Sequence, residues 1–128
     1  MLFVTLPFLL ALWEYNLINI VERMSVEKKN AYIGVDLGGT NMRAGRIVGD
    51  RLVAQGSAPT PKDAADCEET LEALIEVIRS VWDESVVAIG IGVPSVVDRE
   101  KGIVYNVVNI PHWEEVHLKE IIRQCCLL

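Results

Sequence analysis

The sequence predicts an α/β fold with a mixed sheet in the order strand, strand, strand, helix, strand, followed by a further short strand and a helix. Three short runs within residues 31–57 alternate apolar with other side chains and are separated by glycine-containing turns, which predicts three consecutive strands. An amphipathic stretch over residues 64–82 and an apolar run over residues 86–93 follow, as expected for a helix that crosses over to another strand. The chain of 128 residues is long enough for one domain with its own core.

The composition indicates a globular protein and excludes some partners. Hydrophobic residues make up 51% and charged residues 23%, and the formal net charge of -6 argues against a general nucleic-acid binder. The sequence has an odd number of cysteines, which are Cys67, Cys125 and Cys126. The last two are adjacent, and no pair has Cys-x2-Cys spacing. We therefore expect free thiols in a reducing compartment and a cytoplasmic protein.

Residues 1–30 differ from the rest of the chain. The apolar run from Leu2 to Trp13 is too short to span a bilayer, and it has neither a basic residue before it nor an Ala-x-Ala-like site after it. A weak signal-anchor is one alternative; an upstream extension ahead of a second start at Met24 is the other. We expect residues 1–30 to be an apolar extension outside the fold, residues 31–128 to form the domain, and no membrane partner.

The first three strands are expected at Ala31–Leu37, Asn41–Val48 and Arg51–Ser57. Short turns at Gly38-Gly39 and Gly49-Asp50 join them, so they must be antiparallel neighbours. Prolines follow within residues 58–61 and are expected to end this meander, because proline cannot continue a central ladder.

A helix is expected over Ala64–Trp82. One apolar stripe at helical spacing supports it, made of Leu71, Leu74, Ile75, Ile78, Val81 and Trp82. Acidic residues crowd its first turns, where the helix dipole favours negative charge. The apolar run Val86–Val93 then predicts a parallel strand buried on both faces.

In the chain after Val93, the sequence predicts a charged turn over Asp98–Gly102, a short strand at Ile103–Tyr105, and a loop containing Asn109 and Trp113. Apolar residues from Val116 onward suggest a last helix. No cap or stop signal follows it, and a strand buried on both faces needs more chain to cover it. We therefore expect the domain to be incomplete at Leu128.

The most chemically suggestive stretch is the first turn and the ends of its two strands. Asp36 ends a strand, Gly38 and Gly39 have no Cβ, and Thr40 adds a hydroxyl. The carboxylate suits a hard cation, and the glycines let a phosphate approach backbone N–H groups closely. The stretch is neither a P-loop nor a dinucleotide fingerprint, because both need a helix after the turn. A plain Gly-Gly hairpin is the alternative.

Two separated motifs resemble one family. Residues 33–45, Ile-Gly-Val-Asp-Leu-Gly-Gly-Thr-Asn-Met-Arg-Ala-Gly, resemble the first phosphate motif of the actin-like ATPase superfamily of sugar kinases. Residues 90–98, Gly-Ile-Gly-Val-Pro-Ser-Val-Val-Asp, with Gly102–Val104 and Asn109–Trp113, resemble the second stretch of the ROK family of repressors, open reading frames and kinases. The resemblance implies the N-terminal domain of an actin-like ATPase, which is a ribonuclease H-like fold.

The resemblance also implies roles for individual residues. ATP and Mg²⁺ are the implied cofactors, with Asp36 positioning the metal through water. Gly38, Gly39 and Thr40 would contact the phosphates, and the implied flanking residues are Asn41 and Arg43. Ser95 and Asn109 would border the sugar pocket; the family usually has glycine where Ser95 stands, which leaves the sugar open. Trp113 is expected to pack, and His112 and His117 to be surface residues.

The catalytic residues of the family have no counterpart here. Its aspartate base, the second phosphate motif and the zinc-binding cysteines would all lie beyond Leu128, so we assign no catalytic residue and expect zinc only in that part. Kinase chemistry needs a carboxylate base near the acceptor hydroxyl. We therefore expect the chain alone to be inactive.

The leading hypothesis is the N-terminal fragment of an ATP-dependent hexose kinase, most like a glucokinase. A kinase for another hexose or an N-acetylated hexose, and a non-catalytic truncated remnant, are the alternatives. A sugar-responsive repressor of the same family would need a DNA-binding module ahead of Asp36, and only 30 residues with no basic recognition helix precede that motif's strand. Homo-oligomers are compatible with the full-length protein.

Overall fold

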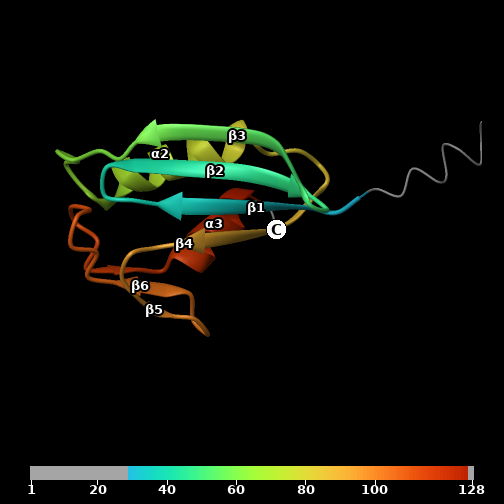
Figure 1. Ribbon diagram of the computed structural model, residues 1–128. Helices are drawn as coiled ribbons and strands as arrows, with labels where there is room; N and C mark the ends of the chain where they lie inside the picture. Colours follow the sequence, from blue (N-terminus) through green and yellow to red (C-terminus); the bar gives the residue numbers. More distant parts are fainter. Residues whose placement is uncertain (1–28, 127–128) are drawn as a thin grey trace, which may run out of the picture.

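A computed structural model describes residues 29–126, so the predicted extension lies almost wholly outside the described residues. Four strands form the main sheet in the order β3-β2-β1-β4 (Figure 1). Their bounds are β1 Ala31–Leu37, β2 Asn41–Val48, β3 Arg51–Pro59 and β4 Val86–Gly92. The predicted order of three strands, a helix and a strand is confirmed, with the bounds of β1 and β2 as expected.

Strand directions follow from the connections. β1 pairs antiparallel with β2, from Ala31 opposite Val48 to Leu37 opposite Met42, and β2 pairs antiparallel with β3. β4 pairs parallel with β1. The helix α2 (Cys67–Ser80) therefore carries the chain from one edge strand, β3, across two strands to the other edge.

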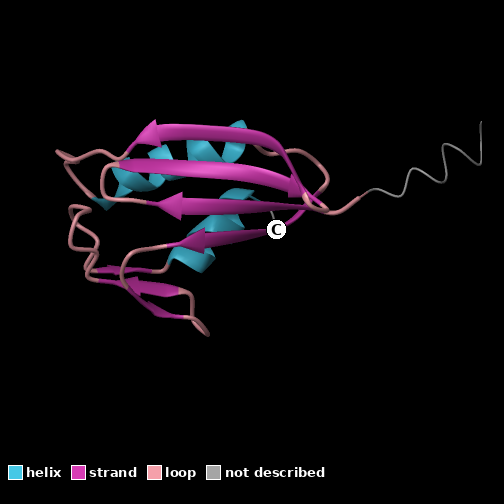
Figure 2. Cartoon of the chain, in the orientation of Figure 1, coloured by secondary structure: helices cyan, strands magenta, loops and turns pink. Residues whose placement is uncertain are grey.

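The core lies on one face of this sheet. β1 alternates strictly between buried and exposed residues, with Ile33 and Val35 buried and Tyr32 and Gly34 exposed. The two helices lie on the same side of the sheet (Figure 2), and α2 contacts β1, β2 and β3. Of the apolar stripe predicted for this helix, Leu71, Leu74 and Ile78 are buried on α2, as expected for a helix packed on a sheet. Ile75 is partly buried, and Val81 and Trp82 lie just after the helix.

α2 is shorter at both ends than the expected Ala64–Trp82. Asp66 has extended backbone angles, and its carboxylate accepts a hydrogen bond from the Glu69 N–H at 3.0 Å. The Glu69 carboxylate in turn accepts one from the Ala65 N–H at 2.9 Å. This reciprocal capping fixes the first helical residue at Cys67.

The third strand is longer than predicted, because proline did not end it. β3 continues to Pro59, which lies opposite Asn41. Proline is tolerated there because β3 is an edge strand of this sheet and its missing N–H breaks no ladder within it.

The prediction that residues 86–93 are buried on both faces is wrong for the described chain. β4 is an edge strand of the main sheet, with β1 as its neighbour. Its Val87 side chain is 47% exposed. β4 is more apolar than its exposure within residues 29–126 would require.

A second, smaller sheet follows. It contains β5 (Val96–Asp98), β6 (Ile103–Tyr105) and β7 (Glu115–Val116), and the helix α3 (Leu118–Cys126) comes after it. Only β6 was predicted as a strand; β5 and β7 have three and two residues, too few for a periodic signal. The last helix begins at Leu118, because Val116 belongs to β7.

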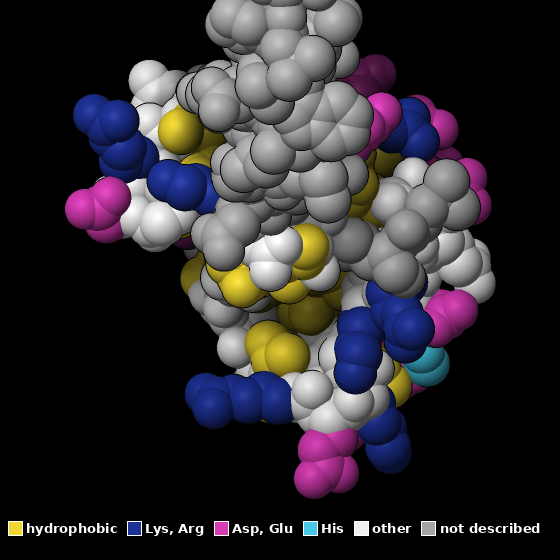
Figure 3. Space-filling view, turned by 90° about the vertical axis from the view of Figure 1, so that its right-hand side faces the viewer, with side chains coloured by type: hydrophobic (Ala, Val, Ile, Leu, Met, Phe, Trp, Pro, Cys, Tyr) yellow, Lys and Arg dark blue, Asp and Glu magenta, His cyan; other side chains and the backbone are white. Residues whose placement is uncertain are grey.

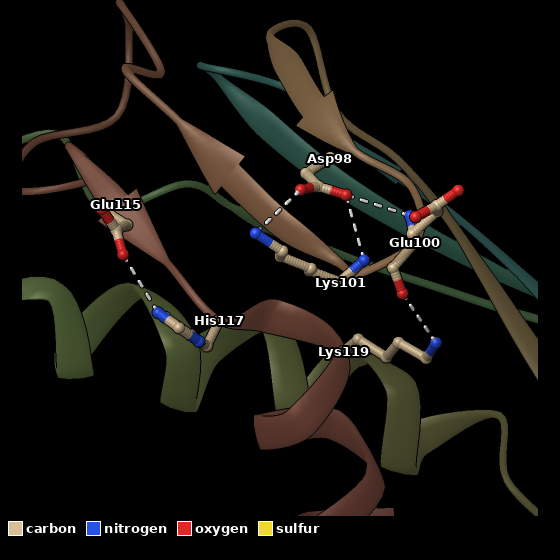
Figure 4. Close-up of polar contacts among 6 residues, drawn as sticks. All are labelled: Asp98, Glu100, Lys101, Glu115, His117 and Lys119. Atoms are coloured by element: carbon tan, nitrogen blue, oxygen red, sulfur yellow. Dashed lines mark hydrogen bonds and ion pairs between the residues drawn. The ribbon is translucent and has the colours of Figure 1, made fainter.

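The predicted charged turn joins β5 to β6. The Asp98 carboxylate accepts hydrogen bonds from the backbone N–H groups of Glu100 and Lys101 at 3.1 and 3.0 Å (Figure 4). Gly102 closes the turn at a φ of 69° and donates its N–H to the Asp98 carbonyl at 2.7 Å. Nearby, the exposed His117 contacts Glu115 at 3.1 Å. Asp98 is thus a turn-forming residue.

The surface is mixed in character. On the face drawn in Figure 3, apolar side chains reach the surface near the centre, and lysine and arginine side chains lie to both sides of them and below, with acidic side chains between. Large exposed apolar residues in the described chain include Tyr32, Leu52, Val96 and Val108. No helix within residues 29–126 is long and apolar enough to cross a bilayer.

Leucine at position 74 tests the assignment of the core. The Leu74 side chain is 0% exposed on α2, whereas the Leu52 side chain on β3 is 59% exposed. Leu74→Ala is expected to lower the free energy of unfolding by about 3 kcal/mol, because it leaves a cavity, and Leu52→Ala by under about 1 kcal/mol. Urea denaturation followed by circular dichroism measures both; equal losses would contradict this packing.

Candidate functional site

Three segments that are far apart in the sequence meet at one end of the main sheet. They are the turn between β1 and β2, the segment that follows β3, and the loop between β6 and β7, all at the left of Figure 1. The carboxyl ends of β1, β3 and β4 lie at this end, where α/β sheets usually bind ligands.

The Gly38–Thr40 turn is held by three hydrogen bonds. The Gly38 N–H donates to the Asn41 carbonyl at 3.0 Å. Thr60 supplies the other two: its hydroxyl donates to the Gly38 carbonyl at 2.6 Å, and its N–H donates to the Thr40 carbonyl at 2.9 Å. Thr60 is only 3% exposed, so both bonds are made from the buried side of the turn.

The two glycines of the turn are required by close approach rather than by an unusual backbone angle. Neither is among the described glycines with positive φ, which are Gly49 and Gly102. A Cβ on Gly38 would lie 2.8 Å from the Asn41 carbonyl oxygen, and one on Gly39 would lie 2.4 Å from the Asn109 Cβ. The predicted hairpin is confirmed, and its second glycine makes room for a distant loop.

The turn and that loop border an open hollow of about 570 Å³, called here the turn hollow. Its lining residues are Gly39, Thr40, Lys62, Val108, Asn109 and Pro111. The structure thus brings together one residue expected at the sugar, Asn109, and two expected at the phosphates. Sequence reasoning missed Lys62, since a single lysine after a Thr-Pro pair has no distinguishing spacing.

Asp36 and Arg43 line a different space, on the open face of the sheet. They lie opposite each other on β1 and β2, at one end of an open hollow of about 820 Å³ called here the sheet-face hollow. Gly34, Gly45 and Gly90 form part of its floor. The predicted phosphate residues therefore do not share one hollow: Gly39 and Thr40 line the turn hollow, Asp36 and Arg43 line the sheet-face hollow, and Gly38 lines neither.

Asn41 and Ser95 line neither hollow. Asn41 is exposed at the start of β2. The Ser95 hydroxyl donates to the Tyr105 carbonyl and lies 3.3 Å from the Asn106 carbonyl. This hydrogen bond links the segment after β4 to the end of β6. Because its proton is used in this way, the Ser95 hydroxyl can act toward a ligand as a hydrogen-bond acceptor.

The loop that carries Asn109 is closed at its base. The Asn106 N–H donates to the Glu114 carbonyl at 2.9 Å, and the Val107 N–H donates to the Trp113 carbonyl at 3.0 Å. Trp113 is 2% exposed, which confirms the expected packing role. His112 lies at the surface, as expected, and its ring nitrogen Nε2 is 3.2 Å from the Ala64 carbonyl oxygen.

The residues present fit ATP phosphates and a magnesium ion. A Cβ at Gly39 would fill part of the turn hollow, and a lysine, a hydroxyl and backbone groups line it, which suits an anion. Asp36 offers one exposed carboxylate, and Mg²⁺ is commonly held by one or two carboxylates together with waters and substrate phosphates. No cluster of three metal-ligating side chains occurs within residues 29–126.

The cysteines give no sign of thiol chemistry. Cys67, Cys125 and Cys126 are all free. Burial raises the pKa of the Cys67 and Cys126 thiols, which lowers the thiolate fraction at neutral pH. The polar chemistry at the turn hollow is therefore the better candidate for function.

Comparison with known proteins agrees with this fold. The described sheet, with its antiparallel meander and parallel β4, is that of an actin-like ATPase domain, and it matches solved ROK kinases. Residues 32–126 match the ROK family. The chain belongs to the ROK family, as its two motifs indicated.

The relatives are sugar kinases that are much longer than this chain. The glucokinase of Thermotoga maritima is 35% identical over 89 residues, which cover 69% of this chain and 28% of that protein. The glucokinase of Streptomyces coelicolor is 34% identical over 94 residues, covering 69% and 27%. The chain thus spans little more than a quarter of these relatives.

Two solved structures share the fold. A ROK family glucokinase from Streptomyces griseus, in complex with glucose and AMPPNP, has a TM-score of 0.68 and 29% identity, covering 77% of this chain and 31% of that one. A ROK hexokinase from Thermus thermophilus has a TM-score of 0.61 and 34% identity, covering 74% and 32%.

Alanine at position 39 tests the approach of the turn to the loop. Gly39→Ala places a methyl group against the Asn109 Cβ and is expected to cost roughly 1–3 kcal/mol. Gly90→Ala is the matched control, because nothing lies within 4 Å of a Cβ there. Thermal and urea unfolding measure the difference.

A second substitution, at Asn109, tests whether the loss caused by Gly39→Ala comes from this contact or from any side chain at position 39. Asn109→Gly removes the opposing Cβ, so the Gly39→Ala/Asn109→Gly pair should recover part of the loss, giving a non-additive double-mutant cycle. Strictly additive effects would contradict the contact.

Proposed function

We propose that this chain carries the ATP-phosphate-binding segment, and part of the sugar-binding segment, of a hexose kinase, with glucose as the favoured sugar. The observation that carries the proposal is the turn hollow, where the Gly39–Thr40 turn approaches Asn109. A phosphate and an acceptor hydroxyl must meet at one place for transfer, and this is the place in the described chain where residues implied for both lie together.

The chemistry proposed for these residues is positioning and charge neutralisation. Bound Mg²⁺ would neutralise charge on the ATP phosphates, and Asp36 would hold it through water. The backbone N–H of Gly39 and the Thr40 hydroxyl would orient the phosphates, flanked by Asn41 and Arg43. Gly38 would let the phosphates approach closely, but its N–H is already donated to the Asn41 carbonyl.

On the sugar side, Asn109 is proposed to hydrogen-bond a sugar hydroxyl from its closed loop. Ser95 would contribute an acceptor lone pair, because its proton is directed to the Tyr105 carbonyl.

Binding without phosphoryl transfer is proposed for the chain by itself. No carboxylate is among the residues that line the turn hollow, and transfer to a sugar hydroxyl needs a general base in reach. We propose that the base belongs to the part of the family's domain that follows the region matched here. Asp98 does not replace it, because its carboxylate is engaged in the turn before β6.

Glucose is proposed over other hexoses because three of the four relatives named above are glucokinases, one of them solved with glucose, and the fourth is a hexokinase. A kinase for another hexose or an N-acetylated hexose is the alternative within the same chemistry. Three free cysteines suit a reducing compartment, and we propose the cytoplasm. Homo-oligomerisation is proposed only for a full-length protein.

Nucleotide binding provides the direct test. Mg-ATP is expected to bind the purified chain and raise its Tm, and Asp36→Asn is expected to weaken Mg-ATP binding about tenfold while leaving the apo Tm within a few degrees. Isothermal titration calorimetry with and without Mg²⁺ measures this. Asp50→Asn, in the exposed turn between β2 and β3, is the matched control. Absence of Mg-ATP binding at millimolar concentrations would overturn the proposal.

Activity tests the second half of the proposal. The chain with Mg-ATP and glucose is expected to form no glucose 6-phosphate above background, measured by a coupled dehydrogenase assay. Formation of product by the purified chain, abolished by Asp36→Asn, would show that a base is present within residues 1–128.

A further inference from the structure

We propose that the segment Thr60–Lys62, directly after β3, is part of the phosphate site. In this assignment Thr60 is a positioning residue that sets the shape of the Gly38–Thr40 turn, and Lys62 is the cation that faces the phosphate groups in the turn hollow. The inference rests on the proposed function, which it deepens by naming two residues that neither motif contains.

Thr60 acts on the turn from its protected side. Its hydroxyl and N–H hold the carbonyls of Gly38 and Thr40 at 2.6 and 2.9 Å. Carbonyls that are held toward Thr60 cannot turn into the hollow, where their partial negative charge would repel a phosphate. The Gly38 N–H is taken by the Asn41 carbonyl, so the N–H groups of Gly39 and Thr40 are the ones left for the ligand, as in other anion-binding turns.

Lys62 lies two residues further on and lines the turn hollow with Gly39, Thr40 and Asn109. Its charge is available: the ion pairs found within residues 29–126 join Arg46 to Asp83, Lys101 to Asp98 and His117 to Glu115, and none involves Lys62. In a chain with a net charge of -6, an uncompensated cation in a hollow with backbone donors favours a polyanion.

The position of Lys62 depends on Thr60. Pro61 stands between them and fixes one backbone angle, so the two hydrogen bonds of Thr60 also determine where the lysine begins. The ligand class that suits the pair is the polyphosphate portion of a nucleoside triphosphate, which is long enough to reach both the turn and the lysine.

The test of Lys62 measures binding of Mg-ATP and of inorganic tripolyphosphate to the whole chain by calorimetry at several salt concentrations. Lys62→Gln is expected to weaken both ligands about five- to tenfold and to flatten the salt dependence, and Lys62→Arg to restore binding within about threefold. Lys101→Gln, at the exposed turn before β6, is the matched control and should change neither.

The test of Thr60 compares two variants. Thr60→Val keeps the shape but loses the hydroxyl, and it is expected to weaken both ligands about fivefold and to speed hydrogen exchange of the Gly38–Asn41 amides; Thr60→Ser is expected to restore both. Rescue by serine identifies the hydroxyl as the cause. If Thr60→Val also unfolds the chain, Thr60→Ser and Thr60→Ala are compared by the same two measurements.

The outcomes separate this inference from the proposed function. Binding by the unmodified chain that is unchanged in Lys62→Gln overturns the role of Lys62 and leaves the ATP site standing. Binding and amide exchange that do not respond to the Thr60 hydroxyl overturn its positioning role. If the unmodified chain binds neither Mg-ATP nor tripolyphosphate, both the inference and the proposed function fail.

Discussion

The structure depends on the two unlike faces of β1. This strand pairs with β2 on one side and β4 on the other, so it is central to the main sheet. Its buried residues, such as Ile33 and Leu37, anchor the core against the helices, while Gly34 and Asp36 lie on the opposite face. A single period-2 pattern therefore supports both folding and the candidate site, and a one-residue slip of register would exchange the two faces.

The candidate site is assembled from contacts between remote segments. Gly39 meets Asn109, and Gly38 meets Thr60, across separations that no local pattern encodes. Each contact uses a small group or a backbone carbonyl at the turn, so the turn is shaped by its neighbours as much as by its own sequence. The chain between this turn and the Asn109 loop contains α2, β4 and β6. The site therefore forms only when these elements are folded, although few residues carry its chemistry.

The sequence predicted the periodic part of the fold well. The bounds of β1 and β2 followed from alternation and from glycine turns, and α2 from its apolar stripe. The ends of α2 and β3 were missed, because the Asp66 cap overrode apolar spacing and Pro59 was tolerated at an edge. β5 and β7 are too short to carry a period. β4 was predicted correctly as a strand but wrongly as buried on both faces. Its apolar composition does not reveal which other elements pack against it.

The site was predicted in part for the same physical reasons. The motifs indicated Asp36, Gly39, Thr40 and Asn109 as candidate residues, and the structure brings Gly39 close to Asn109. Lys62 was missed, because the fold brings it to the turn hollow and no local sequence pattern marks it. Ser95 was expected to face a ligand, yet its proton is used within the protein, which only the coordinates of Tyr105 reveal.

The closed loop that presents Asn109 has a thermodynamic consequence. Two hydrogen bonds at its base and the buried Trp113 fix its path, and Asn106 and His112 adopt positive φ angles of 48° and 62° at its two ends. A loop held in this way loses little conformational entropy when a ligand arrives. Affinity at this site would then reflect the contacts themselves, with little of it consumed in ordering the loop that makes them.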